Sequence, residues 1–136
     1  VERGSDSYEK HVGIDNKTSR VYKSDKSGMI TLSLAQTSVS NDVLDLLQRN
    51  DAAARNSSGL FSVIVKDGSG RSVYSALEAW VSKVPNSAFG SGMQMREWVI
   101  QAAEMQSIIG GNGKVSAEDV ATIEALGGTV SADWVA

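Results

Sequence analysis

The sequence has no cysteine, a single proline and a single histidine, and aromatic residues make up only 6% of its 136 positions. Without cysteine the chain forms no disulfide, no thiolate metal site and no cysteine nucleophile. It has 13 basic and 16 acidic residues without a basic cluster, so tight binding to nucleic-acid phosphates is not expected. No apolar run approaches the length of a membrane span, and no signal peptide is recognisable. The length fits one domain with a real core.

The strongest local signal is a hairpin over residues 60–85. Two β-rich runs flank residues 66–70, and an Asp-Gly pair between alternating apolar residues is typical of a hairpin turn. In the first run Phe61, Val63 and Val65 share one face. In the second run we expect two partly apolar faces: Val73, Leu77, Ala79 and Val81 on one, and Tyr74, Ala76 and Trp80 on the other. Both faces therefore need cover from a helix or from another subunit.

Further stretches alternate as strands do. Residues 7–14 and 18–23 flank a turn at Asp15 and Asn16, which predicts a second hairpin that continues the sheet. Residues 29–37 and 93–103 predict two longer strands, with residues 105–109 as an extension or a short final strand. The shared faces that we expect are Tyr8, Val12 and Ile14, then Ile30, Leu32 and Leu34, then Arg96, Trp98, Ile100 and Ala102.

Two segments have helical spacing. Val43, Leu44 and Leu47 predict a helix over 41–50 with Ser40 as its N-cap, followed by polar chain to residue 59. Ser116 and Asp119 form the pattern of a capping box for a short helix over 117–126. The apolar end of the chain, residues 134–136, needs another segment to receive it. The expected fold is mainly β: an antiparallel β-sandwich or barrel-like protomer with a side-packed α-helix and a short C-terminal helix.

Few residues suggest chemistry. The lone histidine, His11, is expected to be an ordinary strand residue, because no cysteine and no nucleophile-elbow serine accompanies it. Residues 15–28 have the acidic and glycine content of a calcium loop but lack its closing glutamate. Glu78 and Glu97 could face each other as the acid pair of a small hydrolase. Candidates for a carbohydrate platform are Trp80, Trp98 and Trp134.

Several stretches match a known family in their order and spacing. They are VERGSDSYEKHVGIDNKTSRV (1–21), SGMITLSLAQTSVSNDVLDLL (27–47), FSVIVKDGSG (61–70), EAWVSKVPNSAFG (78–90) and REWVIQA (96–102). They resemble the tail tube, or inner tube, structural proteins of contractile-tailed bacteriophages. The resemblance extends to about Gly113, and its motifs are structural in kind. Members of that family usually carry a further segment, including a strand, before the part that corresponds to residues 1–6.

The resemblance implies a structural subunit with no enzymatic activity, cofactor, metal or membrane. Such subunits assemble into homo-hexameric rings that stack into a tube, where the inner strands of six protomers close into one barrel. The tube contacts the tail sheath, the baseplate or tube initiator and the terminator protein, and DNA passes through it transiently and without specificity. The protein would be assembled in the bacterial host cytoplasm and reside in the virion tail. We expect a tail-tube-like domain over 1–113 and a C-terminal extension over 114–136.

On this basis we expect two sets of assembly residues. The candidate lumen-facing residues are Glu9, His11, Thr31 and Ser33. The candidate inter-subunit or inter-ring residues are Asp15, Asn16, Lys17, Tyr74, Trp80, Asn86 and Phe89.

Two rival functions remain open: a monomeric β-sandwich module that binds carbohydrate or protein, and the hydrolase. Within the same assembly class, the inner tube of a tail-like bacteriocin or secretion device is a further alternative.

Overall fold

The computed structural model describes residues 1–136, which form two compact units. The first unit comprises Val1–Val65 and Tyr74–Gln106, and the second comprises Lys66–Val73 and Ser107–Ala136. The chain is mainly β, with antiparallel sheets and two α-helices, as the sequence predicted. Neither helix is long and apolar enough to cross a membrane.

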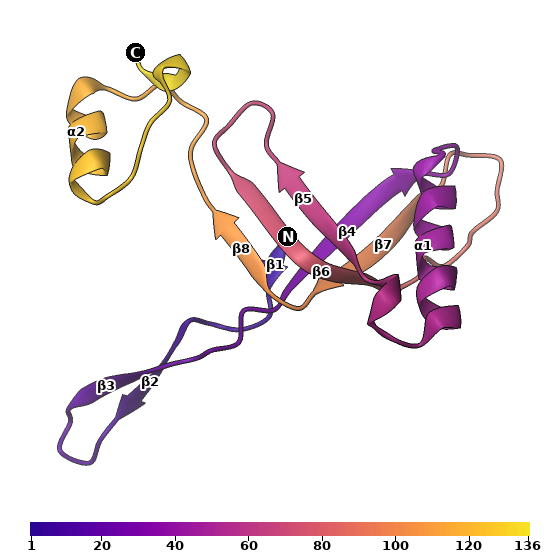
Figure 1. Ribbon diagram of the computed structural model, residues 1–136, viewed down its shortest axis with the longest axis horizontal. Coiled ribbons are helices and arrows are strands. Elements are labelled where there is room, and N and C mark those ends of the chain that lie inside the picture. The colour runs from indigo at the N-terminus through magenta and orange to yellow at the C-terminus, as the bar shows by residue number, and fades with distance from the viewer. The chain divides into compact units, whose positions relative to one another are not determined.

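The main sheet has six strands and dominates the first unit (Figure 1). Five of them lie side by side in the order β1-β4-β7-β6-β5, and β8 pairs with β6 beside the end of β7. A two-residue bend at Ala103 and Glu104 separates β7 from β8, so the residues after Glu104 form a short final strand and do not prolong β7. The bounds are β1 Glu2–Arg3, β4 Gly28–Ala35, β5 Phe61–Lys66, β6 Val73–Lys83, β7 Met95–Ala102 and β8 Met105–Ile108.

The pairing of β4 with β7 explains why the core lies on one face of the sheet. Ile30 is opposite Ile100, and Leu32 is opposite Trp98, so the apolar positions of both strands project to the same side. The intervening residues Thr31 and Ser33 project to the other side and are exposed. The predicted faces of both strands are confirmed.

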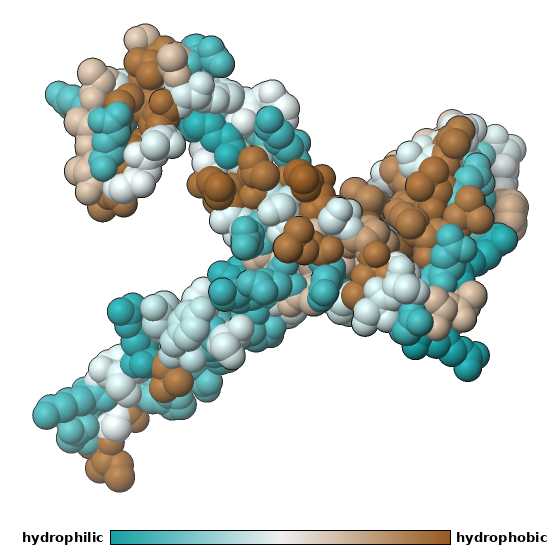
Figure 2. Space-filling model, viewed as in Figure 1, coloured by the Kyte–Doolittle hydropathy of each residue, from teal (hydrophilic) through white to brown (hydrophobic).

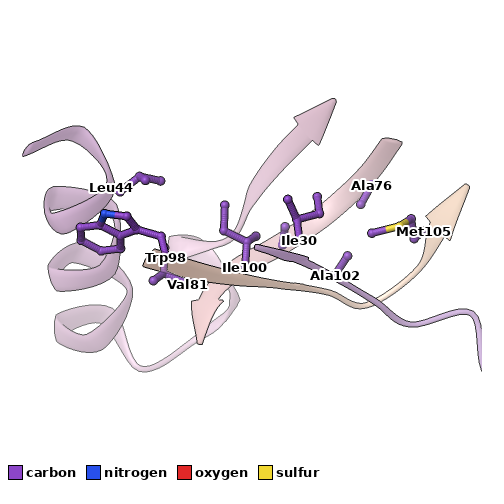
Figure 3. Packing of buried hydrophobic residues seen from close by; sticks show 9 residues of the cluster. Ile30, Leu44, Ala76, Val81, Trp98, Ile100, Ala102 and Met105 are labelled. Carbon is purple, nitrogen blue, oxygen red and sulfur yellow. The ribbon is translucent and has the colours of Figure 1, made fainter. Parts of the chain in front are cut away.

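Helix α1 (Ser40–Ala54) covers this apolar face at one end of the sheet. Figure 3 shows Trp98 pointing from β7 toward α1, next to Leu44. The buried cluster that joins the helix to the sheet consists of Ile30, Leu44, Ala76, Ala79, Val81, Trp98, Ile100, Ala102 and Met105.

A buried hydrogen-bond network fixes α1 to the sheet. Trp98 is only 3% exposed, and its indole Nε1–H donates to Asn41 Oδ1 at 2.9 Å. The Asn41 amide group in turn donates to the carbonyl oxygens of Ala35 at 2.9 Å and Ser38 at 3.0 Å. Asn41 thus connects the first turn of the helix, the end of β4 and the centre of β7.

The predicted boundaries of this helix were wrong at both ends. Ser40 lies inside the helix, the N-cap position is Val39, and the N-cap side chain makes no hydrogen bond. The first amide groups of the helix find other acceptors: the Asn41 amide donates to the Ser38 carbonyl at 3.2 Å, and the Ser40 amide donates to Ser38 Oγ at 3.3 Å. The start of the helix therefore does not depend on a capping side chain of Ser40. The helix also continues to Ala54, where Arg55 ends it at φ 50°, and the short 3₁₀ helix η1 (Ser57–Gly59) follows.

The hairpin of β5 and β6 is confirmed, but the predicted faces of β6 are wrong. Tyr74 and Ala76 lie in or against the core together with Ala79 and Val81, and Leu77 lies outside it. Ala76 and Ala79 are both buried, while Leu77 and Glu78 between them are both exposed, so the side-chain alternation changes phase there. The change coincides with the bend between β7 and β8, where the Ala103 amide donates to the Glu78 carbonyl at 3.0 Å. The sequence of β6 gives no sign of the bend between its partners β7 and β8, so this change of face could not be predicted.

The second predicted hairpin forms a separate two-stranded sheet and does not continue the main one. It consists of β2 (Tyr8–Val12) and β3 (Thr18–Tyr22), and we call it the arm. All ten strand residues are exposed, so the expected apolar face of Tyr8, Val12 and Ile14 covers no core in the chain itself. The alternation was read correctly, but it does not show whether a core lies beneath it.

The second unit contains α2 (Ala117–Ala125) and the 3₁₀ helix η2 (Ala132–Trp134). The predicted capping box is present, because the Ser116 hydroxyl accepts from the Asp119 amide and the Asp119 carboxylate accepts from the Ser116 amide. The apolar chain end packs against other segments, as expected. Val135 forms a parallel bridge with Val115, and the Arg71 guanidinium lies 5.0 Å from the centre of the Trp134 ring.

Replacing Asn41 with leucine tests the network. In Asn41→Leu the carbonyl oxygens of Ala35 and Ser38 still accept hydrogen bonds from the backbone amides of Ser38 and residue 41. The buried group left without a partner is therefore the indole N–H of Trp98. We expect a loss of about 1–3 kcal/mol in the free energy of unfolding, measured by urea denaturation of unassembled protein. Asn50→Leu, the same substitution at an exposed position of α1, should change it by less than about 0.5 kcal/mol. Equal effects of the two would contradict the role assigned to Asn41.

Candidate assembly surfaces

The main sheet has an open edge on each side. On one side, β5 has β6 as its single neighbour, so one edge of residues 61–65 has no strand partner. On the other side, β1 pairs with β4 only at Gly28 and Met29, which leaves one edge of residues 30–34 without a partner. Unpaired backbone N–H and C=O groups of this kind are templates for pairing with another chain. The sheet can therefore be extended at both sides.

The sheet face opposite α1 is partly polar and open. Thr31 and Ser33 on β4 are exposed on it, and Glu97 on β7 is directly opposite Ser33. These positions bring together two of the predicted lumen residues. The other two, Glu9 and His11, lie on the arm, where Glu9 is 3.7 Å from Lys23 and 3.9 Å from His11.

Apolar side chains are also exposed on β5 and β6. Ile64 is 71% exposed and Leu77 is 87% exposed. They line an open hollow of about 580 Å³ together with Ser62, Ser75, Ala76, Glu78, Glu104 and Gln106. Ile64 lies on the face of β5 opposite Phe61, Val63 and Val65, and the exposure of Leu77 follows from the change of phase in β6.

The arm is held by its own contacts. Tyr8 and Tyr22 pack edge to face with ring centroids 5.6 Å apart, and the Arg20 guanidinium lies 4.4 Å from the centre of the Tyr8 ring. Figure 2 shows a mostly hydrophilic arm with hydrophobic surface at its end. Ile14, in the turn between β2 and β3, is 107% exposed, which means that nothing in the chain covers it.

The two segments that connect the arm to the main sheet bond to each other. The Gly4 amide donates to the Ser27 carbonyl and the Lys23 amide to the Ser7 carbonyl, each at 2.8 Å. The Ser27 amide donates to Asp25 Oδ1 at 3.0 Å. This bond, with help from the hydroxyl groups of Ser27 and Ser5, lowers the pKa of Asp25 below its ordinary value. Asp15 and Asp25, which suggested a calcium loop, instead accept hydrogen bonds from backbone amides within turns.

The predicted loop contacts lie in two exposed places. Asp15, Asn16 and Lys17 form the turn of the arm, where the Lys17 amide donates to Asp15 Oδ1 at 3.2 Å and Asn16 takes the left-handed conformation at φ 60°. Asn86 and Phe89 lie in the loop between β6 and β7, and Phe89 is 87% exposed.

The two aromatic candidates on β6 are half-buried. Tyr74 packs against the buried cluster of the first unit. Trp80 pairs with Gln101 on β7, on the face opposite the core. Trp80 therefore keeps surface available to another molecule, and Tyr74 is in part a core residue.

The predicted acid pair is not assembled, and one of the three platform candidates is buried. Glu78 aligns with Ala103 at the end of β7, and Glu97 lies six residues away along that strand, about 20 Å at the usual rise per residue. The two carboxylates cannot act as an acid pair. Trp98 cannot serve as a carbohydrate platform, because its ring is buried against α1.

Comparison with known proteins agrees with the structural character of these surfaces. Residues 1–110 match the family model described as the bacteriophage PhiTE tail tube protein. The chain is also 40% identical over 135 residues to structural protein ORF10 of Pseudomonas phage KPP10, covering 99% of this chain and 78% of that protein. The family and this relative are phage structural proteins and not enzymes. The chain therefore belongs to this family of phage tail tube proteins, as a structural subunit of the virion tail that assembles with itself and with other tail proteins.

Proposed function

We propose that the chain forms hexameric rings which stack into the inner tube of a contractile tail, and that this tube conducts the phage genome into the host. The observation that supports this most directly is the pair of open edges on one sheet. A contact between two different surfaces of the same subunit is heterologous, and such contacts close into rings when the rotation per subunit allows it. Pairing edge to edge around a ring joins the sheets into a barrel without edges.

Electron microscopy of the purified protein tests the assembly. We expect rings with six-fold symmetry in end-on views and stacked tubes in side views, with a matching rise in mass by light scattering. A protein that stays monomeric at high concentration would contradict the proposal. The phage origin of the relative supports a phage tail over the alternative of a bacteriocin or secretion device. A sheath gene beside this gene would support the contractile type and the predicted sheath contact.

We infer that the sheet face opposite α1 faces the lumen. Thr31, Ser33 and Glu97 offer hydroxyl and carboxylate groups there. The cations on the same face are Lys66 at the end of β5 and Lys83, opposite Val99, at the end of β6. A wall with few cations does not hold DNA through its phosphates, so the genome can slide. For Glu9 and His11, whose place is on the arm, lining the lumen stays a prediction.

We assign the arm turn and the loop between β6 and β7 to contacts between rings or with the sheath. Both are exposed and both carry an uncovered apolar residue, Ile14 in the first and Phe89 in the second. Tube initiation at the baseplate, termination at the far end and assembly in the host cytoplasm are part of the same proposal. Trp80, half-buried on β6, is assigned to a contact between subunits.

Replacing Ile14 with aspartate tests the arm. Burying an isoleucine side chain is worth about 1.5–3 kcal/mol, and a charge at that position would have to be desolvated in the contact. We expect Ile14→Asp to form rings but few or short tubes by electron microscopy. The control is Leu126→Asp, at a residue that is 84% exposed in the second unit and should leave tube length unchanged. Normal tubes from Ile14→Asp would show that the arm turn makes no essential contact between rings.

Adding a cation to the proposed lumen tests the passage of DNA. We expect Ser33→Arg tubes, assembled with a short DNA duplex and then pelleted, to retain the duplex at about 50 mM salt and release it at about 200 mM. Wild-type tubes and tubes of Ser19→Arg, the same change on the exposed arm, should retain little of the duplex. If Ser33→Arg tubes did not differ from these two, Ser33 would not face the lumen.

A further inference from the structure

The two open edges of the main sheet match each other in length and direction. Each open stretch has five residues, 61–65 on β5 and 30–34 on β4. Neighbouring strands run antiparallel from β4 through β7 to β6, and β5 turns back from β6 in a hairpin. If β5 of one protomer lies beside β4 of the next, and both protomers have the same orientation in the ring, these two strands are again antiparallel. The contact therefore continues the sheet without a change of pattern.

The apolar residues of the two edges are on the same face. Phe61, Val63 and Val65 are half-buried against the cluster on the α1 side, and Leu32 and Leu34 have the same environment. Ile30 completes this row on β4 and is already buried. Residues at a sheet edge stay partly exposed because no neighbouring strand covers their outer side. A second copy would cover both rows at once.

The side-chain period limits the possible registers. Pairing must place the odd-numbered residues of β5 beside the even-numbered residues of β4, since a slip by one residue would turn an apolar row to the other face. Among the allowed registers, the one with Val63 opposite Leu32 pairs all three apolar residues of each strand. A shift by two residues leaves one residue of each row without its partner.

The first strand blocks the edge beyond this register. β1 pairs with Gly28 and Met29, with Glu2 opposite Met29, so a neighbouring strand cannot extend past Ile30 on that edge. At the other end, the Ala35 carbonyl already accepts bonds from Ser38 and Asn41. The free stretch is therefore just long enough for residues 61–65.

We propose that β5 of one protomer pairs with β4 of the next in a single register, with Phe61 opposite Leu34, Val63 opposite Leu32 and Val65 opposite Ile30. This inference rests on the proposed ring and specifies its contact. On the open face, the same register places Ser62 opposite Ser33 and Ile64 opposite Thr31. The apolar layer beneath α1 then runs from one protomer to the next around the ring.

Disulfide trapping tests this register against a clean background, because the chain has no cysteine of its own. Directly opposite residues have Cα atoms about 4.5–5.5 Å apart, within the range of a disulfide, and a shift by two residues exceeds it. We expect assembled Ser33→Cys/Ser62→Cys protein, after oxidation, to give a covalent ladder ending at the ring size on a non-reducing gel. Thr31→Cys/Ile64→Cys should give the same ladder.

The controls are Ser33→Cys alone, which should give no ladder, and Ser33→Cys/Ile64→Cys, which is displaced by two residues and should react at least 10-fold more slowly. Efficient trapping of this displaced pair in place of the first two would overturn the register. Tubes visible by electron microscopy in which no pair forms a ladder would overturn the β5–β4 contact and leave the tube intact. Wild-type protein without rings or tubes would overturn the proposed function and this contact together.

Discussion

The hydrogen bond between the Trp98 indole and Asn41 is the contact on which the first unit depends most. It joins the middle of the sheet to the first turn of α1 in a buried position, where an unpaired donor is costly. Because Asn41 also binds the end of β4, the same side chain sets the position at which the chain leaves the sheet and begins the helix. The helix can cover only one face of the sheet, and that face becomes the core.

This one-sided cover has consequences for assembly. A helix packed on a single sheet provides a core but does nothing for the edges of that sheet or for its other face. β4 and β5 are left with free backbone groups and half-buried apolar residues. The opposite face is left with exposed polar side chains on β4 and exposed apolar side chains, Ile64 and Leu77, on β5 and β6. These are the properties of a subunit whose structure is completed by identical neighbours. Membership of a tail tube family provides the assembly in which such neighbours occur.

Much of the fold could be predicted from the residues. The alternation in β4, β5 and β7, the Asp-Gly turn and the capping box of α2 all act over a few neighbouring residues, and all were found where expected. The errors came where distant parts of the chain decide. Leu77 changes face because the partner strand of β6 bends, and Asn41, the first residue of the predicted helix, is buried because it bonds to β4 and β7. The arm alternates like a half-buried strand pair and yet covers nothing.

The sequence by itself determined the class of the fold, the family and the absence of thiol chemistry, because composition, alternation and order of motifs are properties of the chain alone. Only the tertiary structure decided which surfaces remain available for assembly. Whether Ser33 is exposed, whether Glu78 meets Glu97 and whether β4 has a free edge depend on strand order and register. Those are set by contacts between residues far apart in the sequence, and local pattern carries no record of them.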